Sequence, residues 1–345
     1  ATRIVLASIG TTDTRWNDSQ VESYRNFANK IWNAARFCLL NSEGAQVGRG
    51  FEGDPQSWAL HDRWIMSRLQ KTTRDVSRSI EAYDFHAAVQ TLYHFFWDDF
   101  CDWYIELSKA DVTGTEASPA RDAARSRVLT VLEQALRLLH PFMPYITEEL
   151  WLRLPGVGVE QMHPAYNHAE PTIMLAAYPQ TREGLIDETA EVEMSIVIEL
   201  ISSVRSIRSE MNIKPSQEID LIVETDDGKL LAFEVKKQVQ RLTRASNVLE
   251  HERDKWPRAA ARGVIAGGRG FAVPLEGLID FAQERERLRK EQEKLTAEAA
   301  KLEAQLSNPS FVGRAPAEKV EELRQRVSDI AQRTGALTQT LEALA

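Results

Sequence analysis

The feature that most constrains the fold is a pair of narrow apolar seams at the C-terminal end of the sequence, on either side of SNPSFVGRAP (307–316). Along both seams apolar residues recur at alternating steps of three and four, with Arg285 and Gln292 as polar exceptions in the first seam, and this is the spacing of a coiled coil. The apolar positions are Phe281, Leu288, Leu295, Ala299, Leu302 and Leu306 in the first seam, and Val320, Leu323, Val327, Ile330, Leu337 and Leu341 in the second. So narrow a seam does not stabilise a single helix in water, and Pro309 and Pro316 keep the connection short. The sequence therefore predicts an antiparallel coiled-coil hairpin at 276–345.

The charges of this hairpin balance. Residues 281–345 hold eleven Lys or Arg and eleven Asp or Glu, so the formal net charge of −9 belongs to the rest of the chain. A neutral rod is not a strong binder of polyanions. A spacer, a dimerisation rod and an arm that touches a partner therefore all remain open, although Arg314 and Lys319 at the turn could still hold a phosphate.

The remainder of the chain divides by its periodicity. Residues 18–185 show long amphipathic helical patterns separated by polar breaks, which predict an α-helical bundle. Residues 186–275 are mixed, with a helix, a strand-like EIDLIVET, a helix near 230–243 and a Gly-rich hairpin. We therefore expect a mainly α protein with a helical bundle at 1–185, of which 1–17 is a junction, a small α/β domain at 186–275 and the coiled-coil arm.

Composition excludes several classes of protein. With 43% apolar residues among 345, the chain can bury more than one core. It contains no apolar run long enough to span a membrane. Cys38 and Cys101 are too far apart and too few for a thiolate zinc site or a disulfide framework. We expect a cytoplasmic protein, and the ordered pattern at its first residues suggests a piece of a longer polypeptide.

The stretch YRNFANKIWNAARF (24–37) contains the most informative helix. On a helical wheel the residues expected to be buried are Tyr24, Phe27, Ala28, Ile31, Trp32, Ala34, Ala35, Cys38 and Leu39. The opposite face holds Asn26, Asn29, Lys30, Asn33 and Arg36, together with Phe37 and Leu40. An exposed Phe costs about 2 kcal/mol in transfer free energy. Either a neighbouring segment covers Phe37, or its ring stacks on an unpaired RNA base while Asn, Arg and Lys contact base edges and phosphate.

This helix also carries a family resemblance, together with DRWIMSRLQ, FHAAVQTLYHFFWDDFCDWYIELSK and LLHPFMPYITEELW. These segments resemble the anticodon-binding bundle of class I aminoacyl-tRNA synthetases for branched aliphatic amino acids. VRSIRSEMNIKPS, PLEGLID and SFVGRAP make the chain most similar, within that group, to the valyl-tRNA synthetases. The resemblance covers essentially the whole chain in order.

The resemblance implies roles for particular residues. Lys30, Asn33, Arg36 and Phe37 match the part of the helix that contacts the anticodon, with Phe37 as the stacking residue. The hairpin resembles the arm that reaches the tRNA elbow, where Arg314, Lys319, Arg324 and Arg326 are the candidate contacts. No catalytic residue and no metal site is expected.

The resemblance also implies that catalysis takes place in a domain other than those of this chain. The HIGH and KMSKS signatures do not occur in this sequence, so this chain alone should not activate valine. ATP and magnesium are expected only for the full-length enzyme, and no cofactor for this chain. The expected partners are valine tRNAs and a catalytic domain located elsewhere, with no membrane, and we expect a monomer.

Two alternatives remain. The chain could be a free-standing tRNA-binding module or a degenerate synthetase paralogue. DDFCD (98–102) also matches the DDxxD spacing by which all-α isoprenoid synthases hold magnesium, but the second carboxylate-bearing helix that such a site needs is not evident. We expect Trp97, Trp103 and Trp151 to lie in the core.

Overall fold

The computed structural model describes residues 2–9, 18–114, 116, 118–158, 165, 171–225, 232–278, 281–308 and 317–343. They form two compact units, Ala1–Ser195 and Ile196–Ala345, and the division between them falls within one helix, α8 (Glu188–Glu210). Among the described helices, none combines the length and the apolar character needed to cross a membrane.

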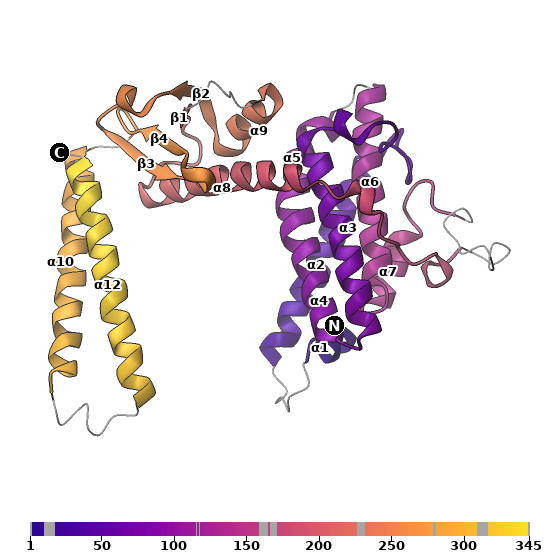
Figure 1. Ribbon diagram of the computed structural model, residues 1–345, viewed down its shortest axis with the longest axis horizontal. Coiled ribbons are helices and arrows are strands. Elements are labelled where there is room, and N and C mark those ends of the chain that lie inside the picture. The colour runs from indigo at the N-terminus through magenta and orange to yellow at the C-terminus, as the bar shows by residue number, and fades with distance from the viewer. Residues whose placement is uncertain are drawn as a thin grey trace. The chain divides into compact units, whose positions relative to one another are not determined.

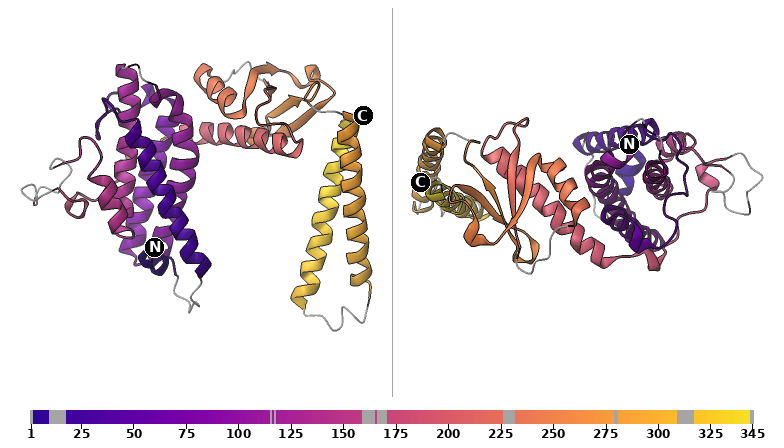
Figure 2. Two further views of the ribbon diagram at one scale, coloured as in Figure 1. Left: turned by 180° about the vertical axis from the view of Figure 1, so that it is seen from behind. Right: turned by 90° about the horizontal axis from the view of Figure 1, so that it is seen from above.

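The first unit is a helical bundle, seen end-on in the right-hand view of Figure 2. Its elements are α1 (Thr2–Ala7), α2 (Asp18–Leu40), η1 (Pro55–Ser57), α3 (Leu60–Glu81), α4 (Phe85–His94), η2 (Phe95–Tyr104), α5 (Ile105–Val112), α6 (Pro119–Leu139), α7 (Pro144–Trp151), η5 (Ile173–Leu175), η6 (Glu183–Leu185) and the start of α8. The sequence sets several of these limits. Ser118 caps α6 by accepting from the Arg121 amide at 3.2 Å, and a proline opens both α6 and α7. The core is aromatic, with Phe27, Phe96 and Trp151 fully buried.

One stretch of the bundle departs from α-helical geometry. α4, η2 and α5 form a continuous helical segment whose middle, FFWDDFCDWY, is a π-helix. Such turns are rare and widen the helix, so side chains no longer follow the 3.6-residue period. As a consequence, the prediction that Trp97 and Trp103 lie in the core is wrong, because both are only half-buried. Trp151, on a regular α-helix, is buried as predicted.

The second unit contains a four-stranded sheet of order β2-β1-β4-β3. Its elements beyond α8 are β1 (Ile219–Glu224), α9 (Phe233–Thr243), β2 (Ala245–His251), η7 (Arg253–Lys255), β3 (Ala260–Val264), η8 (Ala266–Gly268) and β4 (Gly270–Pro274). β1 and β2 are parallel and connected through α9, whereas β4 pairs antiparallel with both β1 and β3. The predicted strand, helix and hairpin are present. β2 was not predicted, because ASNVLEH has a single β-branched residue and mostly exposed positions.

The arm consists of α10 (Phe281–Leu306) and α12 (Ala317–Ala343), which lie side by side in Figure 1. The seam residues Leu288, Leu295, Val320 and Ile330 are buried. Contacts run in opposite directions along the two helices: Glu291 pairs with Arg333 at 2.7 Å, and Glu298 with Arg326 at 3.0 Å. Gln292, which interrupts the first seam, donates to Thr338 Oγ1 at 2.9 Å. These contacts confirm the antiparallel hairpin and, with the bundle and sheet, the mainly α fold class.

Candidate nucleic-acid interface

The inner face of α2 follows the prediction closely. Tyr24, Phe27, Ile31, Ala35 and Cys38 are all buried. Trp32 is the exception, because 42% of its surface is exposed. At about 100° per residue Trp32 lies only about 40° from Arg36 but about 100° from Ile31. Its assignment to the buried face is therefore wrong, and Trp32 belongs to the outer, polar face of the helix.

The outer face of α2 is defined here by Asn29, Trp32, Asn33 and Arg36, which are all exposed. None of these four side chains forms a hydrogen bond, ion pair or ring contact with another residue that the structure describes. On the helical wheel Trp32 and Phe37 are about 140° apart, and the Asn and Arg side chains lie between them. Two rings thus flank a strip of hydrogen-bonding groups, and unpaired RNA bases are bound by stacking on such rings and by hydrogen bonds to their edges.

Lys30 is already engaged within the bundle. Its Nζ lies 2.5 Å from Asp102 Oδ1 of η2 and 4.6 Å from the centroid of the Trp97 ring. The side chain is half-buried, whereas Asn33 and Arg36 are exposed. The structure therefore does not bring Lys30 into the outer face, and an RNA phosphate would have to compete with Asp102 for its charge.

Phe37 lies where α2 approaches its C-terminal end. Its ring is half-buried, and Lys109 Nζ of α5 is 5.9 Å from the ring centroid. Lys109 is itself paired with Glu106 at 2.5 Å. The adjacent Leu40 is exposed over most of its surface. The ring is thus partly accessible beside a neighbouring helix, and the stacking role of Phe37 stays a prediction.

The candidate elbow residues differ in what the structure says of them. Arg314 lies outside the described residues. Lys319, Arg324 and Arg326 are exposed on α12 and each is near a carboxylate, at 2.7 Å from Glu322, 3.5 Å from Glu321 and 3.0 Å from Glu298, respectively. Exposed pairs of this kind contribute about 0–1 kcal/mol each, so a phosphate can replace the carboxylate at low cost.

The acidic run at 98–102 does not form a metal site. Asp98 Oδ2 lies 2.9 Å from His94 Nδ1, Asp99 Oδ2 lies 2.8 Å from Arg68 Nε, and Asp102 pairs with Lys30. Each carboxylate thus has its own basic partner. Within the described residues, no group of three or more His, Cys, Asp or Glu side chains is placed to hold a metal ion. The isoprenoid-synthase alternative therefore finds no support in the geometry.

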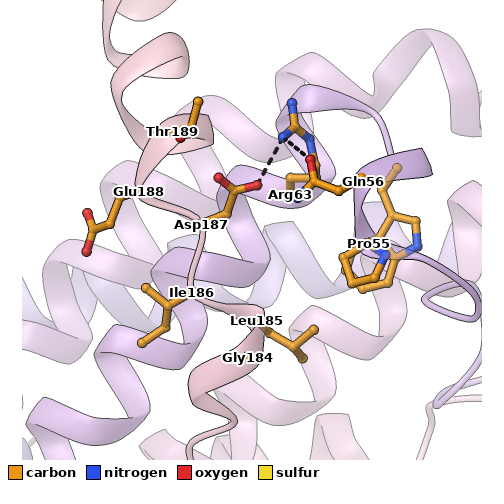
Figure 3. Close-up of a pocket in the computed structure, with 10 residues that line it drawn as sticks. Pro55, Gln56, Arg63, Gly184, Leu185, Ile186, Asp187, Glu188 and Thr189 are labelled. Atoms are coloured by element: carbon orange, nitrogen blue, oxygen red, sulfur yellow. Dashed lines mark hydrogen bonds and ion pairs between the residues drawn. The ribbon is translucent and has the colours of Figure 1, made fainter.

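Figure 3 shows a cavity of about 260 Å³ at the start of α8. Arg63 lines it, but its Nη1 donates to Asp187 Oδ2 at 3.0 Å and to Gln56 Oε1 at 3.3 Å. Asp187 in turn caps α8 by accepting from the Ala190 amide at 2.9 Å. The guanidinium is therefore used to join α3 to α8, and we assign no ligand to this cavity.

Two protein families match the chain. Residues 62–223 match the anticodon-binding domain of tRNA ligases, and residues 280–345 match the valyl-tRNA synthetase tRNA-binding arm. The chain therefore carries an anticodon-binding domain of the tRNA-ligase type and a tRNA-binding arm of the valyl-tRNA synthetase type. The first match begins in α3, so α2 and its outer face precede the matched residues of this synthetase domain.

Curated relatives extend the similarity to the whole chain. The valine–tRNA ligase of Geobacter sulfurreducens is 39% identical over 100% of this chain and 38% of its own length. That of Thermotoga maritima is 37% identical over 99% of this chain and 36% of its own length. The chain thus spans little more than a third of these synthetases. A LeuRS–tRNA–LeuAMS complex from Agrobacterium radiobacter K84 has 17% identity and a TM-score of 0.39 over 61% of this chain and 26% of its own, a likeness too weak to support any inference.

Proposed function

We propose that this chain is the tRNA-recognition part of a valine–tRNA ligase. In this proposal the bundle binds the anticodon loop, and the arm binds the tRNA elbow. The acceptor end of the tRNA then enters a catalytic domain that lies outside these residues, where valine is esterified to tRNA at the expense of ATP. The role of this chain is positional, because correct placement of a reactant accelerates a reaction without any catalytic group.

The observation that carries the proposal is the outer face of α2. Asn29, Asn33 and Arg36 are exposed, and the structure gives none of them a polar partner among the described residues. Trp32 on the same face is 42% exposed, so its ring is accessible to a base that stacks on it. A base that stacks on Trp32 or Phe37 would have its edge within reach of the amides and the guanidinium. Lys30 is a weaker candidate than the other three anticodon residues, because Asp102 competes for it.

The arm is proposed to add affinity without reading sequence. Lys319, Arg324 and Arg326 are exposed, and of their carboxylate partners Glu321 and Glu322 are exposed and Glu298 is half-buried. Contacts of Lys and Arg with phosphate position a nucleic acid and release counterions, so they weaken as salt rises. Arg314 is proposed as a further contact on the basis of sequence alone.

The test is a titration of this chain with a valine tRNA transcript and with the same transcript carrying a foreign anticodon, each at low and moderate salt. The proposal predicts tighter binding of the valine anticodon and a loss of affinity with salt for both transcripts. Preference for the valine anticodon should vanish in Trp32→Ala and Phe37→Ala together. Equal binding of the two transcripts by the wild type would contradict anticodon recognition by this chain.

A free-standing tRNA-binding module is the second candidate. The two possibilities differ in gene context, since an upstream in-frame region that encodes HIGH and KMSKS would make the chain part of a synthetase. They also differ in whether the affinity for tRNA depends on a catalytic domain. A free-standing module should bind tRNA at full strength alone, whereas a part of a synthetase should gain affinity when joined to its catalytic domain.

A further inference from the structure

Two arginines of the second unit converge on one turn. Arg208, in the last turn of α8, donates through Nη2 to the carbonyl oxygens of Lys214 at 2.9 Å and Gln217 at 2.6 Å. Arg244, directly after α9, donates through Nη1 to the carbonyl oxygen of Pro215 at 2.8 Å. Residues Lys214–Gln217 are thus bracketed by two guanidinium groups, one from α8 and one from the residue that follows α9.

The charges of this pair are not neutralised by a carboxylate. Neither arginine forms an ion pair with any residue in the described part of the chain. Arg208 is only 9% exposed, and its Nη1 is buried with no hydrogen-bond partner. Burial, and then the positive charge of Arg244, lower the pKa of Arg208. Two positive charges are therefore held close together where they are partly removed from water. An anion bound between them would offset their repulsion.

One further cation lies on the same turn. Lys214 is exposed, and its ammonium group forms no ion pair among the residues that the structure describes. The nearest acidic residues in the sequence are Glu210 and Glu218. Glu218 accepts from Ser246 Oγ at 2.7 Å, so this carboxylate is engaged on the side of β2. The backbone of the turn offers only carbonyl oxygens to the arginines, which orient them without cancelling their charge.

Arg244 also occupies an unusual backbone conformation. Its φ of 57° and ψ of 40° place it in the left-handed region at the C-terminal cap of α9, where glycine is the usual residue. An arginine here gives the turn a side chain that can serve a purpose that glycine could not. The bond to Pro215 is one such purpose, and the exposed remainder of the guanidinium leaves room for a second.

We propose that Arg244 and Lys214, supported by the buried charge of Arg208, form a phosphate-binding site for the RNA backbone on the small α/β unit. Arg244 is the direct contact, since a guanidinium binds a phosphodiester through paired N–H groups. Lys214 adds a second contact. Arg208 fixes the turn and raises the local positive potential. This inference rests on the proposed tRNA-binding function and adds a third contact region to the anticodon bundle and the arm.

The test measures the salt dependence of tRNA binding by the full 345-residue chain. Affinity for the valine tRNA transcript is titrated between about 50 and about 200 mM NaCl for wild type, Arg244→Gln, Lys214→Gln and Arg244→Lys. Arg262→Gln is the matched control. Arg262 is exposed in the same unit and also donates to a prolyl carbonyl, that of Pro257 at 3.1 Å. Thermal melts of every variant confirm that each is folded.

The expected result is a salt slope smaller by about 1 for Arg244→Gln and for Lys214→Gln, which means an about three- to fourfold smaller loss of affinity over that salt range. Arg244→Lys should keep most of the slope, and Arg262→Gln should keep all of it. The decrease in salt slope should be equal for transcripts with the valine anticodon and with a foreign anticodon, because a phosphate contact does not read bases.

Slopes of Arg244→Gln and Lys214→Gln that match Arg262→Gln would overturn the inference, including the case in which this patch serves an acidic protein instead of RNA. If these slopes are unchanged while Trp32→Ala and Phe37→Ala still abolish anticodon preference, the phosphate site fails and the proposed function stands. If the wild type does not bind the transcript even at low salt, both fail together.

Discussion

The outer face of α2 and the basic residues of the arm are both candidate RNA contacts, but they differ in whether their side chains already have partners within the protein. On α2 the polar side chains Asn29, Asn33 and Arg36 have no partner among the described residues and lie beside an exposed Trp32. On α12 each described candidate is near a carboxylate, as Arg326 is near Glu298. The first surface has groups ready for base edges, whereas the second must exchange one anion for another. The bundle should therefore supply specificity, and the arm should supply salt-dependent affinity.

The two regions also differ in how they are stabilised, and the largest effect tests this. Leu288→Ala removes a seam residue that is only 3% exposed, and should destabilise the arm by about 2–5 kcal/mol. Far-UV circular dichroism should show the early loss of part of the helical signal. Tryptophan fluorescence reports mainly on the first unit, which contains seven of the eight Trp residues, and its transition should not move. Gln305→Ala, at an exposed site of the same helix, is the control. A joint shift of both signals would show that bundle and arm unfold together.

The next effect concerns stacking. Trp32→Ala should weaken binding of the valine tRNA transcript by about 1–3 kcal/mol, because a base loses its aromatic platform. Tyr145→Ala is a matched control, since Tyr145 is an exposed aromatic residue of the same unit on α7. Fluorescence anisotropy measures both affinities. If the two substitutions weaken binding equally, Trp32 has no special role.

A third effect is a pH dependence of the free energy of unfolding that the bundle should show and the arm should not. Burial raises the pKa of the Cys101 thiol to about 12, and burial also raises that of Cys38. An unfolded Cys has a pKa of about 8.5, so the raised folded pKa stabilises the bundle fully below pH 8.5 and progressively less as pH rises towards 12. The free energy of unfolding should fall by up to about 1.4 kcal/mol per pH unit for each thiol above about pH 8.5. Urea melts followed by tryptophan fluorescence measure it, and Cys101→Ala should remove one share of the slope. The arm has no cysteine, so its free energy of unfolding should not fall in this way as pH rises. A free energy of unfolding of the bundle that stays constant from pH 8.5 to 10 would contradict the prediction.

The smallest effect concerns the competition between carboxylates of the protein and RNA phosphates for Arg326 and Lys30. Glu298→Gln removes the partner of Arg326, and Asp102→Asn removes the partner of Lys30. Stability should change by less than about 1 kcal/mol in each case, because both pairs are partly exposed. The salt slope for tRNA should rise in both variants as each cation becomes available for phosphate. A rise in Glu298→Gln alone would place Lys30 outside the RNA interface.

Much of the architecture could be predicted because it depends on patterns within a segment. The seam of Leu288, Leu295, Val320 and Ile330 sets the hairpin, and Pro144 sets the start of α7. β2 was missed because its residues carry little strand preference and are stabilised by pairing with β1. The π-helix was missed because a wider turn leaves no periodic signal in ten residues. The three-part division at 185 and 275 stays a prediction.

The candidate site was less predictable because it depends on distant neighbours. The identity of Lys30 suggests a phosphate contact, but nothing near it in the sequence indicates Asp102, which lies 72 positions away. The sequence left two interpretations of Phe37 open, and it gives no sign that Lys109 of another helix lies near its ring. Trp32 was misplaced because its apolar character outweighed its angular position next to Arg36. That angle was available from the sequence and would have identified the residue.

The central claim is that an anticodon base stacks on Trp32 or Phe37 of α2. It is tested most directly with a valine tRNA that carries 2-aminopurine in its anticodon, since the fluorescence of this base is quenched when it stacks on an aromatic ring. The account predicts a clear change in fluorescence when the wild type binds. The double variant Trp32→Ala/Phe37→Ala should abolish that change and still bind through its basic residues. The same fluorescence change in the double variant at saturation would contradict the claim and locate the anticodon elsewhere.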